Sequence, residues 1–428
     1  MLVYIIMTCL SMAAIAWLYP KREMMEIRIG ELQKNRTEFS AELKKKLILS
    51  CLVAMIPFLA VMSVRWNVGV DTWHTYTPEY LAMKSEYIPL TDEEEQIMLT
   101  SSKLNARMDL RYSKDETDNL TLKEAYDNFR AAYHHTGIGF QLLQRILVFL
   151  KADVQWLYFV TTLLILGFVF ASIWQQSARP LLAVLFFVIT ANFFLSMNIV
   201  SQYIAITICL FACAFAEKRK PISFILLVAI AATFHISALV FLPVYFLPKL
   251  KLKPLWCAIA VAAALLIAQF AFPLIEKLVE AIAPKYARHF SMSAEFEWIF
   301  FAIGCAVFAL GTYYYPKGKD LPYFRLWYYA NVLGLIALCF SGNIPLMKRI
   351  NYYFAAPHFL FIPMLLNLEE NQKRRITLHI LTIGLFCAQI AVAIWHMNKH
   401  ATLPYVTFFE GNRVETMKAL IDHIPGLW

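Results

Sequence analysis

The chain has 428 residues, of which 60% are hydrophobic and 16% are charged. This balance excludes an ordinary soluble domain. Apolar runs long enough to cross about 30 Å of hydrocarbon as helices recur along the whole chain, and they do not alternate as the strands of a barrel would. We therefore expect an all-α, polytopic membrane protein whose residues 1–428 form a single integral membrane domain. The net charge of +9 is then mostly a signal of membrane topology and calls for no nucleic-acid partner.

About twelve transmembrane helices are expected, and the basic clusters between them set their limits. The first run lacks a basic start and is followed by Lys21 and Arg22, so it is interpreted as a retained span and not as a signal peptide. All eight cysteines lie in apolar runs, without disulfide-type or metal-type spacing. In chain order the expected spans are residues 2–19, 47–64, 153–174, 181–196, 199–216, 221–234, 236–248, 255–275, 298–315, 326–341, 352–367 and 376–395.

Charge assigns the loops between these spans to two sides of the membrane. If every second loop is cytoplasmic, the inner side carries a net charge of roughly +12 and the outer side roughly −3, as the positive-inside rule requires. The basic loops include Lys21–Lys46, Glu217–Lys220 and Lys249–Lys253. Both termini and one large hydrophilic loop, residues 65–151, are then expected outside. This segment is called the outer loop below.

The outer loop carries two helix signatures. Thr91-x-x-Glu94 has the pattern of a capping box and is followed by apolar residues at helical spacing. Ser113-x-x-Glu116 precedes a second apolar stripe that begins at Leu122. We expect short helices that cover the outer face of the membrane domain.

Two apolar segments are too short for ordinary spans. Residues 138–150 number about 13, which suits an interfacial or re-entrant helix, or a buried helix that packs the outer loop. Residues 221–247 must hold two helices of about 14 residues, each rising about 20 Å. Such a pair is expected where the membrane is thinned around a wet cavity, or as a tilted pair in a packed bundle. His235 lies at its junction.

The expected topology brings polar residues from four separate turns to the outer side. Cations gathered at headgroup level are what a phosphate or pyrophosphate ligand requires. Each residue alone has a simpler interpretation: an arginine can anchor headgroups, a histidine can be a satisfied core residue, and Asp71 can cap a following helix. The residues concerned are Arg65, Asp71, His74, Asn198, Ser201, Gln202, His235, Lys348 and Arg349.

Four motifs in chain order share these residues: Arg65-x-x-x-Gly69-x-Asp71-x-x-x-x-Tyr76, Asn198-x-x-Ser201-Gln202-x-x-Ala205, His235-x-Ser237-Ala238 and Arg349-x-x-x-Tyr353-Phe354. Together, over roughly residues 50 to 370, they resemble the motifs of the EpsG-like, Wzy-type polysaccharide polymerases. The sequence departs from that pattern at two places. Ser201 stands where the family usually carries arginine, and His134-His135-Thr136-Gly137 stands where an acidic stretch is common.

The resemblance implies a glycosyltransferase of the bacterial cytoplasmic membrane. It would transfer an undecaprenyl-diphosphate-linked glycan onto a lipid-linked repeat unit at the outer face, and so build O-antigen, capsule or exopolysaccharide. Its partners would be lipid-linked oligosaccharides, the membrane and a chain-length regulator. We expect no nucleotide sugar, no cofactor and no metal ion.

The resemblance also suggests roles for individual residues. Arg65 and Arg349 would contact the pyrophosphate, whose developing charge cations stabilise. Lys348 or Arg145 would replace the cation missing at position 201, and Gln202 would be a further substrate contact. The candidates for the general base, or for the group that orients it, are His235, Asp71 and His74.

Other classes of membrane protein stay open. A lipid-linked oligosaccharide flippase or other transporter would carry charged residues at several depths and internal repeats, neither of which is evident. An acyltransferase would need a His/Arg pair in the first spans, where none occurs. A glycan ligase uses the same kind of donor, and the sequence does not separate it from a polymerase.

Overall fold

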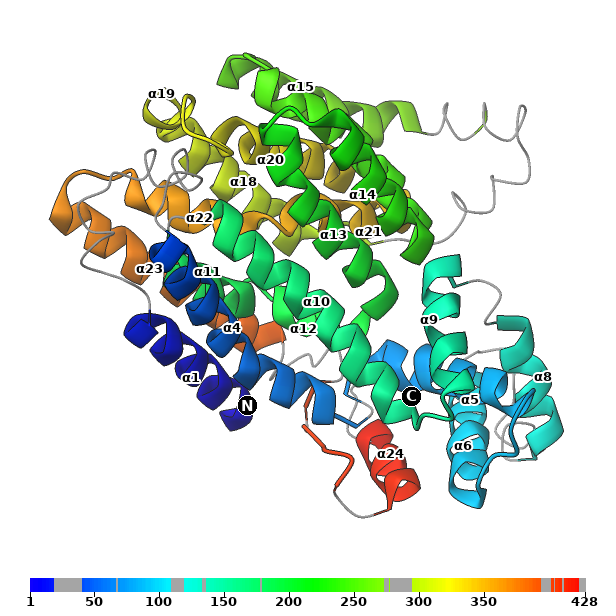
Figure 1. Ribbon diagram of the computed structural model, residues 1–428. Coiled ribbons are helices and arrows are strands. Elements are labelled where there is room, and N and C mark those ends of the chain that lie inside the picture. Colours follow the sequence, from blue (N-terminus) through cyan, green and yellow to red (C-terminus); the bar gives the residue numbers. More distant parts are fainter. Residues whose placement is uncertain are drawn as a thin grey trace.

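The computed structural model describes residues 1–18, 41–66, 68–108, 119–132, 136–177, 179–272, 277, 295–393, 402–403, 405–409 and 412–422. Every named element in these residues is a helix (Figure 1). Arg65 and Thr407 form an isolated antiparallel β-bridge outside any named strand. The all-helical fold class is therefore confirmed.

The helices of the bundle occupy the segments that were predicted as spans. The predicted span 181–196 is bent by 56° between two helices at Ala191, whose φ of 64° is left-handed. The predicted span 352–367 is likewise divided. In chain order the bundle consists of α1 (Leu2–Leu18), α4 (Ala41–Val64), α10 (Val154–Gln176), α11 (Pro180–Ile189), α12 (Asn192–Asn198), α13 (Val200–Glu217), α14 (Pro221–Phe234), η4 (Ile236–Lys249), α15 (Pro254–Leu266), η5 (Ile267–Ala271), α18 (Trp298–Tyr313), α19 (Tyr315–Gly318), α20 (Phe324–Cys339), α21 (Leu346–Ala355), α22 (His358–Asn367) and α23 (Gln372–Ala391).

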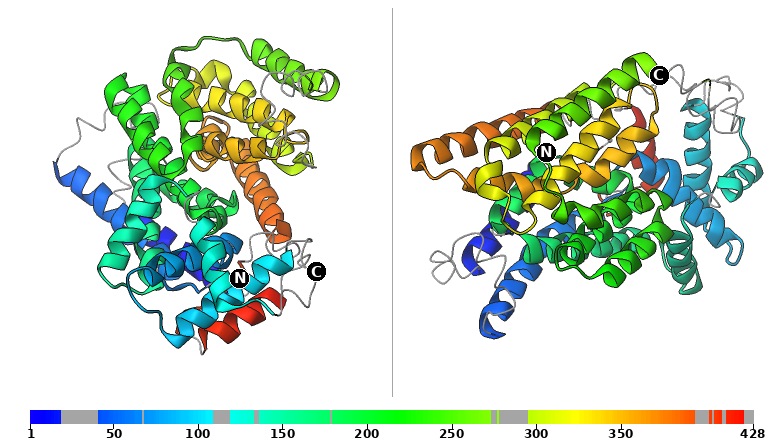
Figure 2. Two further views of the ribbon diagram at one scale, coloured as in Figure 1. Left: turned by 90° about the vertical axis from the view of Figure 1, so that its right-hand side faces the viewer. Right: turned by 90° about the horizontal axis from the view of Figure 1, so that it is seen from above.

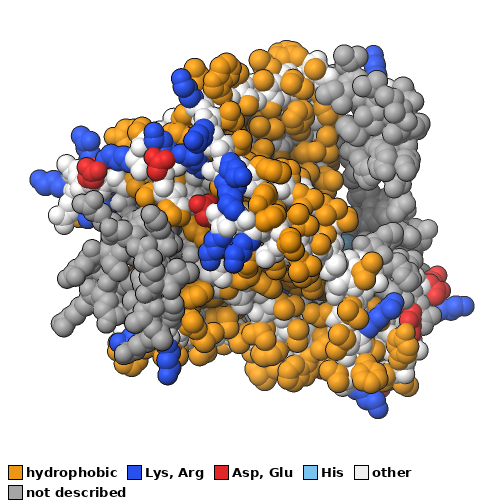
Figure 3. Space-filling model, turned by 45° about the horizontal axis from the view of Figure 1, so that its top comes forward, with side chains coloured by type: hydrophobic (Ala, Val, Ile, Leu, Met, Phe, Trp, Pro, Cys, Tyr) orange, Lys and Arg blue, Asp and Glu red, His pale blue; other side chains and the backbone are white. Residues whose placement is uncertain are grey.

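Several of these helices are apolar enough for a bilayer. Val154–Gln176, Val200–Glu217 and Pro254–Ala271 are long enough to cross it alone, and the bent α11–α12 pair makes a fourth candidate. Eight further apolar helices in the described residues have 10–17 residues each. Hydrophobic side chains cover most of the face in Figure 3, as expected of a surface that meets lipid. The larger number of about twelve spans stays a prediction.

The turns of the bundle lie at two ends, as the predicted alternation requires. Polar contacts join the basic turns to one another at one end: Tyr315 Oη to the Leu252 carbonyl at 3.2 Å, Lys317 Nζ to Glu370 at 3.1 Å, and Arg179 Nη2 to Asn367 Oδ1 at 3.0 Å. A different set joins the turns at the other end: Asp71 N to Asn198 Oδ1 at 3.0 Å, Ser201 Oγ to the Phe234 carbonyl at 2.8 Å, and Gln202 Nε2 to the Arg349 carbonyl at 2.9 Å.

The short pair 221–247 differs from its prediction in one helix. α14 is an α-helix of 14 residues that rises about 21 Å. η4 is a 3-10 helix of 14 residues, which rises about 28 Å because each residue advances about 2.0 Å. It contains Pro243 and Pro248, which lack the N–H donor of an α-helical hydrogen bond. η4 thus comes close to the thickness of the hydrocarbon, and α14 remains short.

The outer loop forms a small group of helices at one end of the bundle (Figures 1 and 2). The predicted capping box is present: Thr91 N donates to Glu94 Oε2, and Glu94 N donates to Thr91 Oγ1. The predicted cap at Ser113 and Glu116 lies outside the described residues. The group consists of η2 (Thr72–Tyr76), α5 (Thr77–Ser85), α6 (Asp92–Met108), α8 (Leu122–Ala132) and α9 (Ile138–Phe149), with α24 (Arg413–Asp422) packed beside α6.

A different capping box starts α8. Thr121 N donates to Glu124 Oε2 at 2.8 Å, and Glu124 N donates to Thr121 Oγ1 at 3.3 Å. The apolar stripe was therefore predicted correctly, while its cap is Thr121. The signal was visible in the sequence, because Thr121 directly precedes the helix and Glu124 lies in its first turn.

α9 buries one side and exposes the other. Phe140, Gln144 and Leu147 are buried, whereas Leu142 and Phe149 are exposed. The helix packs against α14, α5 and α10. Its exposed apolar side is what an interfacial helix would present to lipid.

Candidate active site

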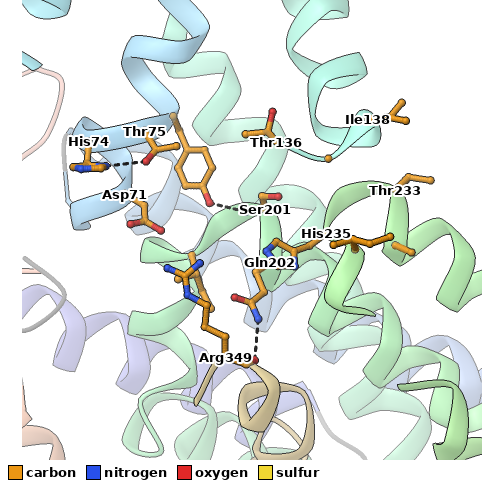
Figure 4. A pocket seen from close by; sticks show the side chains of 15 residues that line it. Asp71, His74, Thr75, Thr136, Ile138, Ser201, Gln202, Thr233, His235 and Arg349 are labelled. Atoms are coloured by element: carbon orange, nitrogen blue, oxygen red, sulfur yellow. Dashed lines mark hydrogen bonds between the residues drawn. The ribbon is translucent and has the colours of Figure 1, made fainter. Parts of the chain in front are cut away.

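A cavity of about 500 Å³ lies between the outer loop and the bundle (Figure 4). Its walls come from η2, from the start of α9, from the α12–α13 and α14–η4 turns, and from α21. Six of the nine polar residues that the sequence placed on the outer side meet in it: Asp71, His74, Ser201, Gln202, His235 and Arg349. Its remaining lining residues are Thr75, Tyr76, Thr136, Gly137, Ile138, Ile199, Ala232, Thr233 and Ile236.

A close approach of two backbones places Asp71 at the cavity. Gly69 has a φ of +104°, and a Cβ built on it would lie 2.6 Å from the Met197 carbonyl oxygen. Only glycine therefore lets the outer loop pass α12 at this distance. The Asp71 N–H then donates to Asn198 Oδ1 at 3.0 Å. Asp71 precedes η2, a π-helix, and wide turns of this kind occur frequently at functional sites.

The carboxylate of Asp71 does not cap the helix that follows. Its backbone is helical, with φ −62° and ψ −17°, and no capping hydrogen bond from its side chain is present. Asp71 therefore stands at the N-cap position of η2 without capping that helix through its side chain. Burial raises the pKa of the Asp71 carboxyl to about 6, against the opposing effect of the Arg349 charge. The carboxylate faces the cavity and is mostly ionised at neutral pH.

Arg349 supplies the positive charge of the cavity. Its guanidinium points toward Asp71 in Figure 4, and its carbonyl oxygen accepts the hydrogen bond from Gln202. Within the part of the chain that the structure describes, the guanidinium makes no hydrogen bond and no ion pair. The neighbouring Lys348 differs, since its Nζ lies 2.5 Å from Glu297 Oε1. Arg349 is thus the cation at this turn that remains available to an anionic ligand.

Two histidines line the cavity. His235 Nδ1 lies 2.6 Å from Ser237 Oγ, and Ser237 Oγ donates to Tyr353 Oη at 3.0 Å. Burial, reinforced by the Arg349 charge, lowers the pKa of His235 to about 4. His74 Nδ1 hydrogen-bonds Thr75 Oγ1 at 3.1 Å, and burial lowers its pKa as well. Both rings are therefore neutral at pH 7.

Two glycines fix the start of α9 against the end of α14. A Cβ on Gly137 would lie 2.2 Å from the Phe234 carbonyl oxygen, and one on Gly139 would lie 2.5 Å from Thr233 Oγ1. Side chains at these positions would push the two helices apart. This segment is the one that departs from the acidic family pattern. His134 and His135 lie outside the described residues, while Thr136 and Gly137 line the cavity.

The structure does not bring Arg65 into the cavity. Its side chain is fully buried in the bundle, where Nη1 donates to the Met62 carbonyl and to Thr162 Oγ1, and the guanidinium lies 5.3 Å from the Tyr158 ring centroid. Arg65 is not among the residues that line the cavity. The expected pyrophosphate contact at Arg65 is therefore corrected to a structural role.

The other two predicted cations are also absent from the lining. Lys348 is paired with Glu297 and lies over the Phe300 ring. Arg145 is exposed on α9, two turns beyond the part of that helix that meets the cavity. Neither residue therefore supplies to the cavity the cation that the family usually carries at position 201.

Sequence reasoning missed three residues near the site. Ser237 and Tyr353 form the chain of hydrogen bonds to His235, and both stand within the quoted motifs, where they were not singled out. Glu79 is buried on α5, and burial with the nearby Asp71 charge raises its pKa to about 8. No sequence signal marks Glu79, because acidic residues are common throughout the outer loop. Among the described residues, no group of three His, Cys, Asp or Glu is placed to hold a metal ion.

An apolar helical bundle with a cavity of charged and polar side chains at one end is typical of a membrane protein with a polar site at its surface. The sequence model of the EpsG family matches residues 48–407. The match covers most of the chain, so the protein belongs to the EpsG family. No curated protein and no solved structure matches it.

Proposed function

We propose that this protein is a polysaccharide polymerase of the bacterial cytoplasmic membrane. It would transfer an undecaprenyl-diphosphate-linked glycan onto the terminal sugar of a lipid-linked repeat unit. The observation that carries the proposal is the guanidinium of Arg349, which has no hydrogen-bond or ion-pair partner among the described residues and points toward the Asp71 carboxylate in a cavity of about 500 Å³. Membership of the EpsG family supports the same class of reaction.

The donor diphosphate would bind at Arg349. A guanidinium offers paired N–H donors that match phosphate oxygens, and its charge stabilises the negative charge that grows on the leaving group. The first turn of α9 also meets the cavity, and no side-chain hydrogen bond caps it. Its backbone N–H groups add positive potential on the opposite wall.

Asp71 is the preferred general base. The acceptor hydroxyl oxygen bonds to the anomeric carbon of the donor glycan, and the bond from that carbon to the diphosphate oxygen breaks. The hydroxyl proton passes to the Asp71 carboxylate, and the lipid diphosphate leaves with the bonding electron pair. A base with a pKa of about 6 is ionised at neutral pH and still accepts a proton, whereas the pKa of about 4 makes His235 a weaker base.

His235 and Gln202 would then position the substrate and Arg349, and would not transfer a proton. The neutral His235 ring, held by Ser237, can hydrogen-bond a sugar hydroxyl at the cavity wall. Gln202 holds the backbone of Arg349 and so sets where the guanidinium lies. His74 lies on the far side of Asp71 from His235, where it can orient the acceptor (Figure 4).

Synthesis from a defined lipid-linked repeat unit tests the proposal. The purified chain in nanodiscs should lengthen the glycan, and Arg349→Ala should not. A flippase would move the glycan across a vesicle membrane without lengthening it, and a ligase would need a second, different acceptor lipid. Unchanged glycan length with the unsubstituted chain would refute the polymerase.

The proposed orientation places the cavity, the outer loop and both termini on the outer side. Single cysteines at the exposed positions Glu93 and Lys218, in a variant without the native cysteines, test this placement, because the two residues lie at opposite ends of the bundle. A membrane-impermeant thiol reagent applied to intact cells should label the cysteine at position 93 and not the one at 218. Labelling at 218 instead would remove the basis for an outer-face reaction.

A further inference from the structure

The mouth of the cavity lies between the start of α9 and the start of η4. Ile138 and Ile236 line the cavity, and they are 78% and 71% exposed. Figure 4 shows Ile138 and Thr233 on the side of the cavity that is remote from His74. The cavity therefore opens at this side onto apolar surface, while its charged groups lie farther inside.

The apolar surface continues from the mouth as a row of side chains on η4. Residues three apart eclipse one another in a 3-10 helix, so Ile236, Leu239 and Leu242 lie in one line. Leu239 and Leu242 are 45% and 38% exposed. The row begins at Ile236 and follows η4 from the cavity end of the bundle toward its basic end.

We propose that the isoprenyl chain of the lipid diphosphate leaves the cavity between Ile138 and Ile236 and lies along the exposed row on η4. This inference rests on the proposed function, and it adds the residues that recognise the lipid part of the donor. Ile138 and Ile236 are thereby specificity-determining residues. They are separate from the residues that hold the diphosphate.

The chemistry of the two ends of this path defines the ligand. At the inner end the guanidinium of Arg349, which has no ion-pair partner among the described residues, can bind an anion, and at the outer end the exposed Ile138 and Ile236 favour an apolar chain. A soluble nucleotide sugar would place a polar base against Ile138 and Ile236 and would leave its hydrogen-bonding groups without partners there. An amphiphile with a diphosphate head and a hydrocarbon tail satisfies both ends.

The mouth has one fixed wall. The contacts of Gly137 and Gly139 with Thr233 and Phe234 hold the start of α9 directly against α14. Ile138 stands between the two glycines and is therefore held at the rim. A side chain fixed in this way can discriminate between tails by contact.

Photo-crosslinking gives the first test. The full chain in nanodiscs is mixed with an isoprenyl diphosphate that carries a diazirine on its first isoprene unit, and adducts are located by mass spectrometry. We expect adducts at Ile138 and Ile236 that fall about tenfold when unlabelled undecaprenyl diphosphate is added in tenfold excess. Adducts at Ile222, an 81% exposed isoleucine at the far end of α14, report random contact with the bilayer and should not fall.

Matched substitutions give the second test. Ile138→Asn and Ile236→Asn should weaken binding of undecaprenyl diphosphate about fivefold or more, because the chain would bury an amide without a partner. Binding of methyl diphosphate, which has the same head and no chain, should not change. Ile222→Asn should affect neither ligand.

Each alternative result overturns the inference. Rim adducts that resist competition, or that are absent, mean that the chain leaves elsewhere. Equal weakening of both ligands in Ile138→Asn means that the side chain supports the diphosphate site and not the tail. The proposed function fails separately: competed adducts at the rim together with no lengthening of the glycan would keep the lipid path and refute the polymerase.

Discussion

Gln202 Nε2 donates a hydrogen bond of 2.9 Å to the carbonyl oxygen of Arg349, and this contact ties the start of α13 to α21 (Figure 4). The bond uses the backbone of Arg349, so the guanidinium stays available. An arginine whose main chain is held, and whose guanidinium makes no ion pair with another described residue, is organised in advance for an anion. The predictions about Arg349 follow from this arrangement.

Arg349→Ala should abolish polymer formation while the amount of protein in the membrane stays unchanged. The side chain has no hydrogen-bond or ion-pair partner among the described residues, so its removal strands no buried group. Arg349→Lys should recover little activity, because an ammonium group lacks the paired donors of the guanidinium. Polymer length on gels and protein level on immunoblots measure both effects. Full-length polymer from the alanine variant would contradict the assignment.

Substitution of Arg65 is expected to lower the stability of the protein, whereas substitution of Arg349 is expected to abolish activity. Its guanidinium is fully buried and donates to the Met62 carbonyl and Thr162, so Arg65→Ala leaves these acceptors and a cavity behind. We expect a loss of stability of about 2–5 kcal/mol, seen as a lower melting temperature of the purified protein. A stable but inactive Arg65→Ala protein would argue instead for a direct role with the substrate.

The pKa of Asp71 predicts the acid side of the activity profile. Burial raises it to about 6, and the ionised form is the one that accepts a proton. Activity should therefore fall as the pH drops through about 6 and reach a plateau above it. Asp71→Asn should remove at least about a hundredfold of the rate, the usual range for a general base. An acid limb near pH 4 would point to His235 instead.

The sequence predicted most helices because apolar length and basic clusters are local signals. α10 was expected at 153–174 and spans Val154–Gln176, and the junction of the short pair falls at His235 as expected. The helix type of η4 and the break at Ala191 were not predicted. For η4 a local sign was present, because Pro243 and Pro248 cannot donate the hydrogen bonds of an α-helix.

The same distinction applies to the site. Alternation of the turns was sufficient to place Asp71, Gln202, His235 and Arg349 at one end. Whether Arg65, Lys348 or Arg349 can bind an anionic ligand depends on acidic residues and backbone contacts contributed by distant segments. Glu297 pairs with Lys348. The backbone N–H of Trp66 donates to the Val406 carbonyl, so a segment about 340 residues away folds over the region of Arg65. The sequence alone contained no sign of either contact.

Gly137→Ala should reduce activity strongly, because its Cβ would lie 2.2 Å from the Phe234 carbonyl oxygen and force α9 away from α14. The change would move the cavity wall without touching a charged residue. Gly384→Ala is the matched control, since a Cβ there meets nothing within 4 Å. Polymer assays on both variants at equal protein level measure the effect. Equal activity in the two would mean that the α9–α14 contact can shift at no cost.

Substitutions of His235 distinguish a role in positioning the sugar from the role of general base. Its pKa of about 4 makes it neutral at pH 7, and its Nδ1 is occupied by Ser237. If it positions the sugar by hydrogen bonding, His235→Gln should keep substantially more activity than Asp71→Asn, because the amide can still donate and accept. His235→Leu should lose most activity, since the side chain would remove the hydrogen bond to Ser237 and leave the sugar hydroxyl without a partner. Initial rates of glycan lengthening for the three variants decide between the residues. A loss of about a hundredfold or more in His235→Gln, with Asp71→Asn still active, would transfer the role of base to His235.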